Sequence, residues 1–255
     1  MPVFSLLGLF TGSFLNVCID RLPREQSIIN PPSHCPNCNQ KLSVLDLIPI
    51  FSYLWLRGKC RYCQASIPLR LPIVEGVTSL LFTFLYWNFG ISLELGISLI
   101  YGCILIIIFV IDLEHQLVLN VVTYPSIIIA LILSIFWTGL DMNSWLQIEE
   151  LNRIVISLAG GAVGLAAMAL PIIIYPKSMG WGDIKLGALI GVMTGYPLIF
   201  VVVLLSWISG GTIAAILLAL KIKQRKDPIP FATFLAVATM VTLLWGQLIY
   251  QWYIY

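Results

Sequence analysis

The sequence predicts an all-α polytopic membrane protein with about eight transmembrane helices and a small cytoplasmic zinc-binding domain between the first two. Three observations support this fold class. Hydrophobic residues make up 59% of the 255 residues, charged residues make up 10%, and the mean hydropathy is +0.96, which is far more apolar than a soluble domain of this length. Long runs of the sequence carry no charge. The one sizeable polar segment contains two Cys-x-x-Cys pairs.

The helices follow from the charge-free runs, because about 20 apolar residues cross the hydrocarbon as a helix. The runs cover residues 1–19, 76–93, 95–111, 116–140, 154–176, 186–220 and 231–255. The run 186–220 is too long for one span and contains TGYP at 194–197, so we divide it into a short helix and a longer one. The first run has no basic region before it and no convincing cleavage site, so we expect a permanent span rather than a signal peptide. Eight helices result.

The orientation follows from the basic residues. With the amino terminus outside, residues 20–72 place seven of the fourteen Lys and Arg residues in the cytoplasm, residues 221–228 place four there, and Lys177 and Lys185 add two. Only Arg153 lies outside, which is a strong positive-inside pattern. The net charge of +2 therefore reflects membrane topology, and we expect no nucleic-acid partner.

These assignments give three predicted segments. Residues 1–19 form the first transmembrane helix, residues 20–72 the cytoplasmic domain, and residues 73–255 a membrane domain of about seven helices.

The cytoplasmic domain contains four cysteines with the spacing of a zinc site. Cys35 and Cys38 form one Cys-x-x-Cys pair, Cys60 and Cys63 form another, and 21 residues separate the pairs. Two such pairs present four thiolates to one tetrahedral Zn(II) ion. Two disulfides or a redox-active pair are the alternatives, although a cytoplasmic location disfavours disulfides. Bound zinc would supply folding energy to a domain of about fifty residues, so we expect a structural role.

Two aspartates lie at the ends of predicted membrane spans, where a charged side chain is costly. Asp112 ends the third predicted span and Asp183 begins the sixth, and the predicted topology places both at the cytoplasmic face. Ionisable groups at membrane depth are candidates for function. Two carboxyl groups at close range share a proton, so one can act as base on a water while the other donates to a scissile carbonyl.

The alternative is two independent residues at helix ends. Asp183 would then be an ordinary cap at a helix amino end, but Asp112 lies at a carboxyl end, where negative charge is unfavourable. Gly180 and Gly182 precede Asp183 and permit either a close approach or unusual backbone dihedrals.

Several motifs together resemble a known family along nearly the whole chain. They are GSFLNVCIDRLP at 12–23, IPIFSYLWLRGKCRYC at 48–63, PIVE at 72–75, and Gly-x-Gly-Asp at 180–183 followed by IKLGA. With them, the chain resembles the bacterial prepilin peptidases of the type IV leader peptidase family. The resemblance implies that Asp112 and Asp183 are the two catalytic aspartates of a membrane aspartyl protease.

The resemblance also implies location, substrates and a second activity. Such enzymes lie in the bacterial inner membrane and cut type IV prepilins and pseudopilins on the cytoplasmic side, after a glycine. Many then methylate the new amino terminus with S-adenosylmethionine. We predict that Gly58 and Lys59 belong to the site for this cofactor, the alternative being a simple turn before the second cysteine pair.

The chain departs from the family pattern at two places. Leu119 and Asn120 stand where the family often has Leu-Pro-Asp, and FATFLA at 231–236 replaces Phe-Gly-Pro-Phe-Leu-Ala. We expect neither departure to affect the chemistry.

Three other classes of protein remain to be compared. A presenilin-type protease without methylase activity would not explain the four cysteines. A transporter would be expected to have paired broken helices at the midplane. A zinc-bearing scaffold would need neither aspartate.

Overall fold

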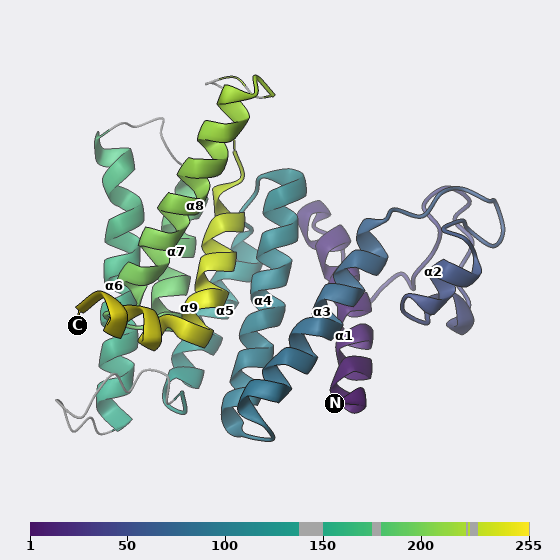
Figure 1. Cartoon of the computed structure of the whole chain (residues 1–255). Helices are drawn as coiled ribbons and strands as arrows, with labels where there is room; N and C mark the ends of the chain where they lie inside the picture. The colour runs from purple at the N-terminus through teal and green to yellow at the C-terminus, as the bar shows by residue number, and fades with distance from the viewer. Residues whose placement is uncertain (138–149, 175–179, 223, 225–228, 255) are drawn as a thin grey trace. The chain divides into compact units, whose positions relative to one another are not determined.

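The computed structural model describes residues 1–137, 150–174, 180–222, 224 and 229–254. These residues are helical, with two isolated β-bridges and no strands (Figure 1). The long helices are α1 Pro2–Arg21, α3 Arg70–Phe89, α4 Leu93–His115, α5 Asn120–Ser134, α6 Glu150–Ile174, α7 Trp181–Thr194, α8 Ile199–Ala219 and α9 Phe231–Ile254. Three short elements lie between α1 and α3, namely η1 Leu22–Arg24, η2 Val44–Leu47 and α2 Phe51–Trp55.

The eight long helices among the described residues correspond one by one to the eight predicted helices, and the predicted break at 194–197 separates α7 from α8. Within the part of the chain that the structure describes, five helices are long and apolar enough to cross a membrane: Pro2–Arg24, Leu93–His115, Arg153–Ile173, Ile199–Ala219 and Phe231–Trp252. The polytopic membrane fold is therefore confirmed, whereas the number of eight spans is not. The helices α5 and α7 have 15 and 14 residues, fewer than the roughly 20 that a full crossing requires.

Part of the orientation argument falls outside the described residues. Lys177 lies there, and so do residues 223 and 225–228 of the basic segment 221–228. The chain forms two compact units, Met1–Leu95 and Gly96–Tyr255.

In the first unit, α1 packs along α3 through two glycines one helical turn apart. A Cβ atom on Gly8 would lie 2.6 Å from the Cα of Ser79, and one on Gly12 would lie 2.7 Å from the Cα of Glu75. Small residues at this spacing allow two membrane helices to bring their backbones together. The hydroxyls of Ser5 and Ser79 also share a hydrogen bond of 2.9 Å. By contacts, α3 thus forms one unit with α1, although the sequence places it in the segment 73–255.

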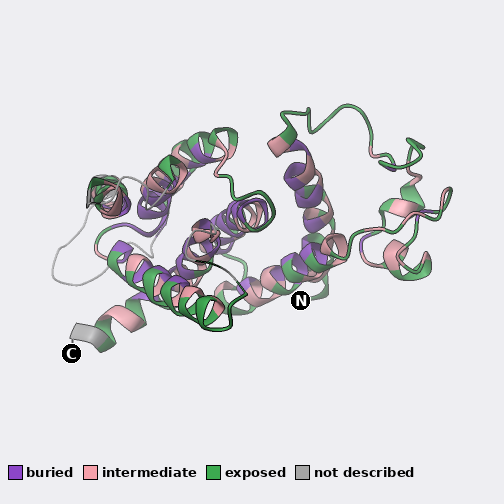
Figure 2. Ribbon diagram, turned by 90° about the horizontal axis from the view of Figure 1, so that it is seen from above, coloured by how far each residue is buried: buried purple, intermediate pink, exposed green. Residues whose placement is uncertain are grey.

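The segment between α1 and α3, residues 22–69, is called the four-cysteine module below. Its buried residues are only Cys35, Pro49 and Cys60. Figure 2 shows how this differs from the long helices, along which buried residues recur on one face. The module therefore lacks an apolar core of its own.

In the second unit, α7 contacts α5, α6 and α9. Its contact with α6 rests on Gly160 and Gly164 of α6 and Gly187 and Gly191 of α7, since a Cβ atom on any of the four would collide with the facing helix backbone. The hydroxyl of Ser157 adds a hydrogen bond of 2.7 Å to a carbonyl of α7. Close packing on several sides fixes α7, whose first turn carries one of the two aspartates.

Candidate functional site

Asp112 lies in the last turn of α4 and is 4% exposed. The backbone N–H of Thr233, in the first turn of α9, donates a hydrogen bond of 2.9 Å to its Oδ2. The backbone of Ala232 makes a second contact with the same carboxylate. The amino end of a helix is a favourable site for negative charge, so α9 stabilises a carboxylate that the end of α4 would disfavour.

This contact bears on one expectation from the sequence. Thr233 and Ala232 belong to FATFLA at 231–236, the departure that was expected to leave the chemistry unaffected. Both residues contact Asp112 through their backbone, so this departure lies beside the candidate site, and its effect on the chemistry stays a prediction. The signal available in the sequence was Asp112 itself: a carboxylate at a helix carboxyl end implies a donor from elsewhere in the fold.

Asp183 lies in the first turn of α7 and is partly exposed. Its Oδ2 accepts a hydrogen bond of 3.3 Å from the backbone N–H of Gly180, so it caps the helix as an ordinary aspartate would. It also interacts electrostatically with Asp112. The two carboxyl groups therefore lie within electrostatic range of each other in the second unit.

The glycine before Asp183 allows a close approach. A Cβ atom on Gly182 would lie 2.8 Å from the Cβ of Val118, in the loop between α4 and α5. Gly180 has an ordinary extended backbone, with φ of −82°. Of the two possibilities for these glycines, the close approach is therefore the one observed, and it occurs at Gly182.

A second link joins the start of α7 to the start of α5. The ammonium group of Lys185 donates a hydrogen bond of 2.9 Å to Oδ1 of Asn120 and lies 5.3 Å from the ring centroid of Tyr124. Asn120 is the residue that departs from the family pattern, and here it is the partner of Lys185. The amino ends of α5, α7 and α9 thus meet the carboxyl end of α4.

A shallow apolar recess adjoins this end of α4. Its lining comes from the last turns of α4, the following loop and the first turn of α5: Ile107, Ile108, Ile111, Leu117, Val118, Leu119 and Val122. A carboxyl pair beside an apolar surface can hold one shared proton and act on a peptide whose neighbouring side chains are apolar.

The four predicted metal ligands lie together in the module. The Sγ atoms of Cys35, Cys38, Cys60 and Cys63 all fall within 4.8 Å of one another, and those of Cys35 and Cys63 are 3.8 Å apart. Four thiolates bound tetrahedrally to zinc at about 2.3 Å would be separated by about 3.8 Å. All six cysteines of the chain are free thiols, so the donor set fits a metal ion and the disulfide alternative is not favoured.

The two cysteine pairs have the same backbone conformation, and each is called a knuckle below. Each knuckle is closed by an isolated β-bridge, His34 with Lys41 in the first and Lys59 with Ser66 in the second. The residue that follows each second cysteine has a positive φ, 56° at Asn39 and 59° at Gln64. Two equivalent loops that present two thiols each are typical of structural zinc sites.

Side chains around the cysteines also favour metal binding. The side-chain amide of Asn37 donates a hydrogen bond of 3.5 Å to Sγ of Cys63. This bond and one from the backbone of Ala65 outweigh desolvation and lower the pKa of the Cys63 thiol to about 6. The thiolate is the form that binds a metal.

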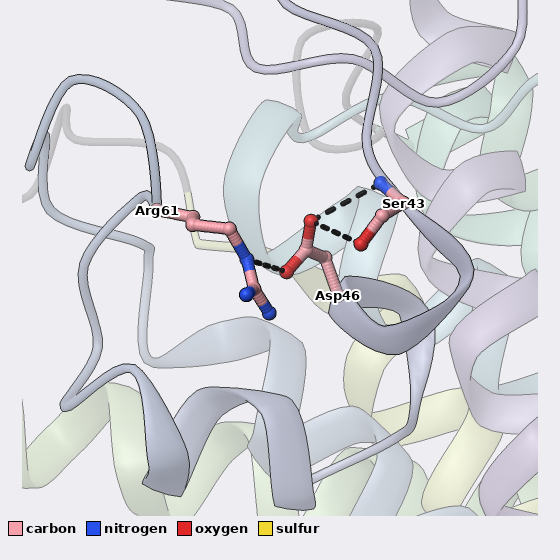
Figure 3. A network of polar contacts seen from close by, with 3 residues as sticks. All are labelled: Ser43, Asp46 and Arg61. Atoms are coloured by element: carbon pink, nitrogen blue, oxygen red, sulfur yellow. Dashed lines mark hydrogen bonds and ion pairs between the residues drawn. The ribbon is translucent and has the colours of Figure 1, made fainter.

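The knuckles are held by an ion pair that the sequence reasoning missed (Figure 3). The Oδ1 of Asp46 accepts a bond of 2.7 Å from Arg61, which lies inside the second knuckle, and its Oδ2 accepts bonds from the backbone N–H and hydroxyl of Ser43. Desolvation opposes ionisation, but the bonds from Ser43 and the charge of Arg61 outweigh it and lower the pKa of Asp46. The Ser-x-x-Asp capping pattern at 43–46 was the available signal.

Gly58 and Lys59, the predicted cofactor residues, form the turn that enters the second knuckle. Gly58 has φ of +70°, its N–H donates to the carbonyl of Tyr53, and its carbonyl accepts from the N–H of Ile67. The backbone of Gly58 is therefore used within the turn, whereas the side chain of Lys59 is exposed. Their role toward a cofactor stays a prediction.

Comparisons with known proteins cover most of the chain. Residues 6–89 match the Bacterial Peptidase A24 N-terminal domain, and residues 99–216 match the Type IV leader peptidase family. A prepilin leader peptidase/N-methyltransferase from Stutzerimonas stutzeri is 34% identical, over 95% of this chain and 89% of that protein. Proteins of the same name from Pseudomonas aeruginosa and Bacillus subtilis are each 32% identical, over 98% and 100% of this chain and 91% and 98% of their own lengths. No solved structure matches the chain.

Proposed function

The chain belongs to the type IV leader peptidase family, and we propose on this basis that it removes the leader peptide from type IV prepilins and pseudopilins and N-methylates the new amino terminus. It is an enzyme of an aspartic peptidase family. The proposal is supported by the positions of Asp112 and Asp183, which lie within electrostatic range of each other in the second unit, with Asp112 held by the first turn of α9.

The pair supports a mechanism in which the two aspartates share one proton. The ionised carboxylate takes a proton from a water molecule, which attacks the scissile carbonyl, while the protonated carboxyl group donates to the carbonyl oxygen. Transfer of a proton to the leaving amine completes the cleavage. Two carboxyl groups suffice for these steps because each can accept and return a proton within the same geometry.

The surroundings of the pair support an apolar substrate in a membrane. A type IV prepilin carries a hydrophobic segment directly after its cleavage site, and the recess lined by Ile108, Ile111 and Val118 offers an apolar surface beside Asp112. We place the pair and the four-cysteine module at the cytoplasmic face of the bacterial inner membrane, because thirteen of the fourteen basic residues fall on one side of the predicted topology.

The module supports two further assignments. We propose that Cys35, Cys38, Cys60 and Cys63 hold a structural zinc ion, which cross-links a segment without an apolar core. We assign the methyl donor S-adenosylmethionine to the same module, with Lys59 as the candidate partner for the carboxylate of that cofactor. The donor supplies the methyl group, and the exposed ammonium group of Lys59 supplies a charge to orient it.

The other classes are less well supported. A presenilin-like protease without methylase activity leaves the four-cysteine module unexplained, and the relatives named above carry both activities in their names. A transporter or a scaffold gives no reason for two carboxyl groups within electrostatic range of each other. None of these three classes is favoured by a specific feature of the described residues.

Co-expression of the full chain with a type IV prepilin, followed by intact-mass measurement of the pilin, tests both activities. We expect loss of the leader and the addition of one methyl group. An uncleaved prepilin in cells whose membranes contain the chain would contradict the peptidase assignment. A cleaved but unmethylated pilin would restrict the proposal to a peptidase.

A further inference from the structure

The four-cysteine module exposes a set of large apolar side chains on η2 and α2, called the α2 surface below. Its members are Val44, Leu45, Phe51, Leu54 and Trp55, with exposed fractions from 62% to 85%. Phe51, Leu54 and Trp55 are spaced i, i+3 and i+4, so they lie on one face of their helical turn. The other two members lie on η2, which contacts α2. Soluble segments rarely expose so many large apolar side chains together.

The opposite side of α2 is used to build the module. The hydroxyl of Tyr53 would lie 2.8 Å from a Cβ atom on Gly58, so Tyr53 packs on the turn that enters the second knuckle. The N–H of Gly58 also donates to the carbonyl of Tyr53. One side of α2 thus faces the metal-binding loops, and the apolar side faces outward.

The start of α2 is fixed to α3, the helix that packs along α1. Glu75, in the second turn of α3 and 8% exposed, accepts a hydrogen bond of 2.8 Å from the backbone N–H of Ile50, the residue before α2. The Cδ1 of Ile50 lies 3.7 Å from the position of a Cβ atom on Gly76. Ile50 has φ of 60°, which is rare for a β-branched residue, so these contacts hold a conformation that the residue would not adopt freely.

This attachment sets the depth of α2 relative to the bilayer. Gly76 begins the charge-free part of α3, residues 76–89, and α3 packs along α1, which is apolar enough to span. On this basis we place Glu75 where the hydrocarbon begins, and α2 starts at the same level. An apolar surface at this level meets the headgroup region rather than open water.

The charge of the module matches an anionic membrane surface. Residues 22–69 contain five basic and two acidic residues, a net charge of +3 (5 − 2). Arg57 and Lys59, which follow Trp55 closely in the chain, are both exposed. Tryptophan with neighbouring Arg and Lys is the composition of interfacial membrane anchors, in which the ring enters the headgroup layer and the cations meet anionic lipids.

We propose that the α2 surface binds the headgroup region of the bilayer beside α3 and anchors the four-cysteine module to anionic phospholipid. Glu75 and Ile50 fix the start of this anchor, Trp55 and its apolar neighbours enter the interface, and Arg57 contacts lipid phosphate. This anchor does not depend on the proposed peptidase activity, and its test does not use that activity.

The test follows Trp55 in the full chain reconstituted in nanodiscs, with and without anionic lipid. The chain has eight tryptophans, so the contribution of Trp55 is obtained by subtracting the emission of a Trp55→Phe variant from that of the unaltered chain. We expect strong quenching of this difference by lipids brominated near the headgroups and weak quenching by acrylamide in the water. A Tyr62→Trp variant on the Trp55→Phe background is the matched control, since Tyr62 is an exposed aromatic residue of the second knuckle, and acrylamide should quench it.

Charge dependence gives a second measurement. Arg57→Gln should reduce the bromolipid quenching of Trp55 in anionic nanodiscs, with a roughly fivefold shift toward the detached state, the size expected for one basic residue at an anionic surface. Two outcomes would overturn the proposal. Ready quenching of Trp55 by acrylamide would place it in water, and protection from both quenchers would show that protein, not lipid, covers the α2 surface.

Discussion

The backbone N–H of Thr233 donates a hydrogen bond of 2.9 Å to the carboxylate of Asp112, a residue 121 positions earlier in the chain. The bond joins the amino end of α9 to the carboxyl end of α4. It explains how a buried carboxylate is tolerated at a helix end that disfavours negative charge, because a second helix presents its amino end to the same group. The bond therefore fixes the position of the Asp112 carboxylate.

Asp112→Asn and Asp183→Asn should each abolish cleavage of a co-expressed prepilin. Asn preserves the shape of the side chain but cannot take up or release a proton, and general acid–base catalysis contributes about 10²- to 10⁴-fold in rate. Glu114→Gln is the matched control, since Glu114 is an exposed acid two residues after Asp112. Cleavage measured by intact mass at near-normal levels in either aspartate variant, at equal membrane abundance, would rule out the aspartyl mechanism.

Thr233→Pro, which introduces the proline of the family pattern at this position, should lower the cleavage rate by no more than about fivefold, the size of one net hydrogen bond. Proline removes the N–H that contacts Asp112 but is compatible with the first turn of a helix, where Thr233 lies. Thr233→Ala keeps the N–H and should cleave almost normally, although it loses the hydroxyl bond to the carbonyl of Pro230. Equal rates for the two variants would show that this bond does not affect the chemistry.

The helices could be predicted because membrane helices are determined locally, by runs of apolar residues without charge. The division at 194–197 was visible for the same reason. The packing of α6 on α7 depends instead on which short side chains meet across two helices, as Gly164 and Gly187 do. Each helix carries a Gly-x-x-x-Gly pair in the sequence, but the pair does not indicate which helix will pack against it.

The site was predictable to a similar extent. Asp112, Asp183 and the four cysteines stand out because charges and thiols at those positions need a chemical reason. The groups that hold them could not be derived in this way, because the donor from Thr233 is a backbone N–H and every residue except proline has one. Its position follows from the three-dimensional arrangement of α4 and α9, not from a side-chain type.

Gly182→Ala should lower the cleavage rate at least tenfold, because the new Cβ atom would lie 2.8 Å from the Cβ of Val118 and displace the first turn of α7 with Asp183. A shift of about 1 Å in a catalytic group can cost 10²-fold in rate. Val118→Gly removes the colliding atom, so the double variant should recover part of the lost rate in the same assay. A double variant as slow as Gly182→Ala would show that the glycine serves another purpose.

The purified chain should contain about one zinc ion, the stoichiometry of four thiolates, and Cys35→Ser or Cys60→Ser should remove it. Asp46→Ala should retain zinc less tightly, by about 10- to 100-fold in competition with a chromogenic chelator, because groups that orient metal ligands have effects of this size. Lys41→Ala is the control, as Lys41 is exposed. A stable, fully active chain without metal would contradict the structural role of zinc.

Lys59→Ala should separate the two proposed activities. Lys59 lies beside the second knuckle in the first unit, whereas Asp112 and Asp183 lie in the second unit, so loss of the ammonium group should spare cleavage and reduce methylation. Intact-mass measurement of a co-expressed pilin should then show a mature chain without the methyl group, while Asp183→Asn should still bind S-adenosylmethionine in an equilibrium assay. Because Lys59 adjoins Cys60, zinc content must be measured in the same sample, and Lys41→Ala, at an exposed basic residue of the first knuckle, provides the control. Normal methylation by Lys59→Ala would show that the cofactor is held elsewhere.

If Lys59→Ala instead lost cleavage while retaining zinc, the four-cysteine module would also contribute to the peptidase reaction.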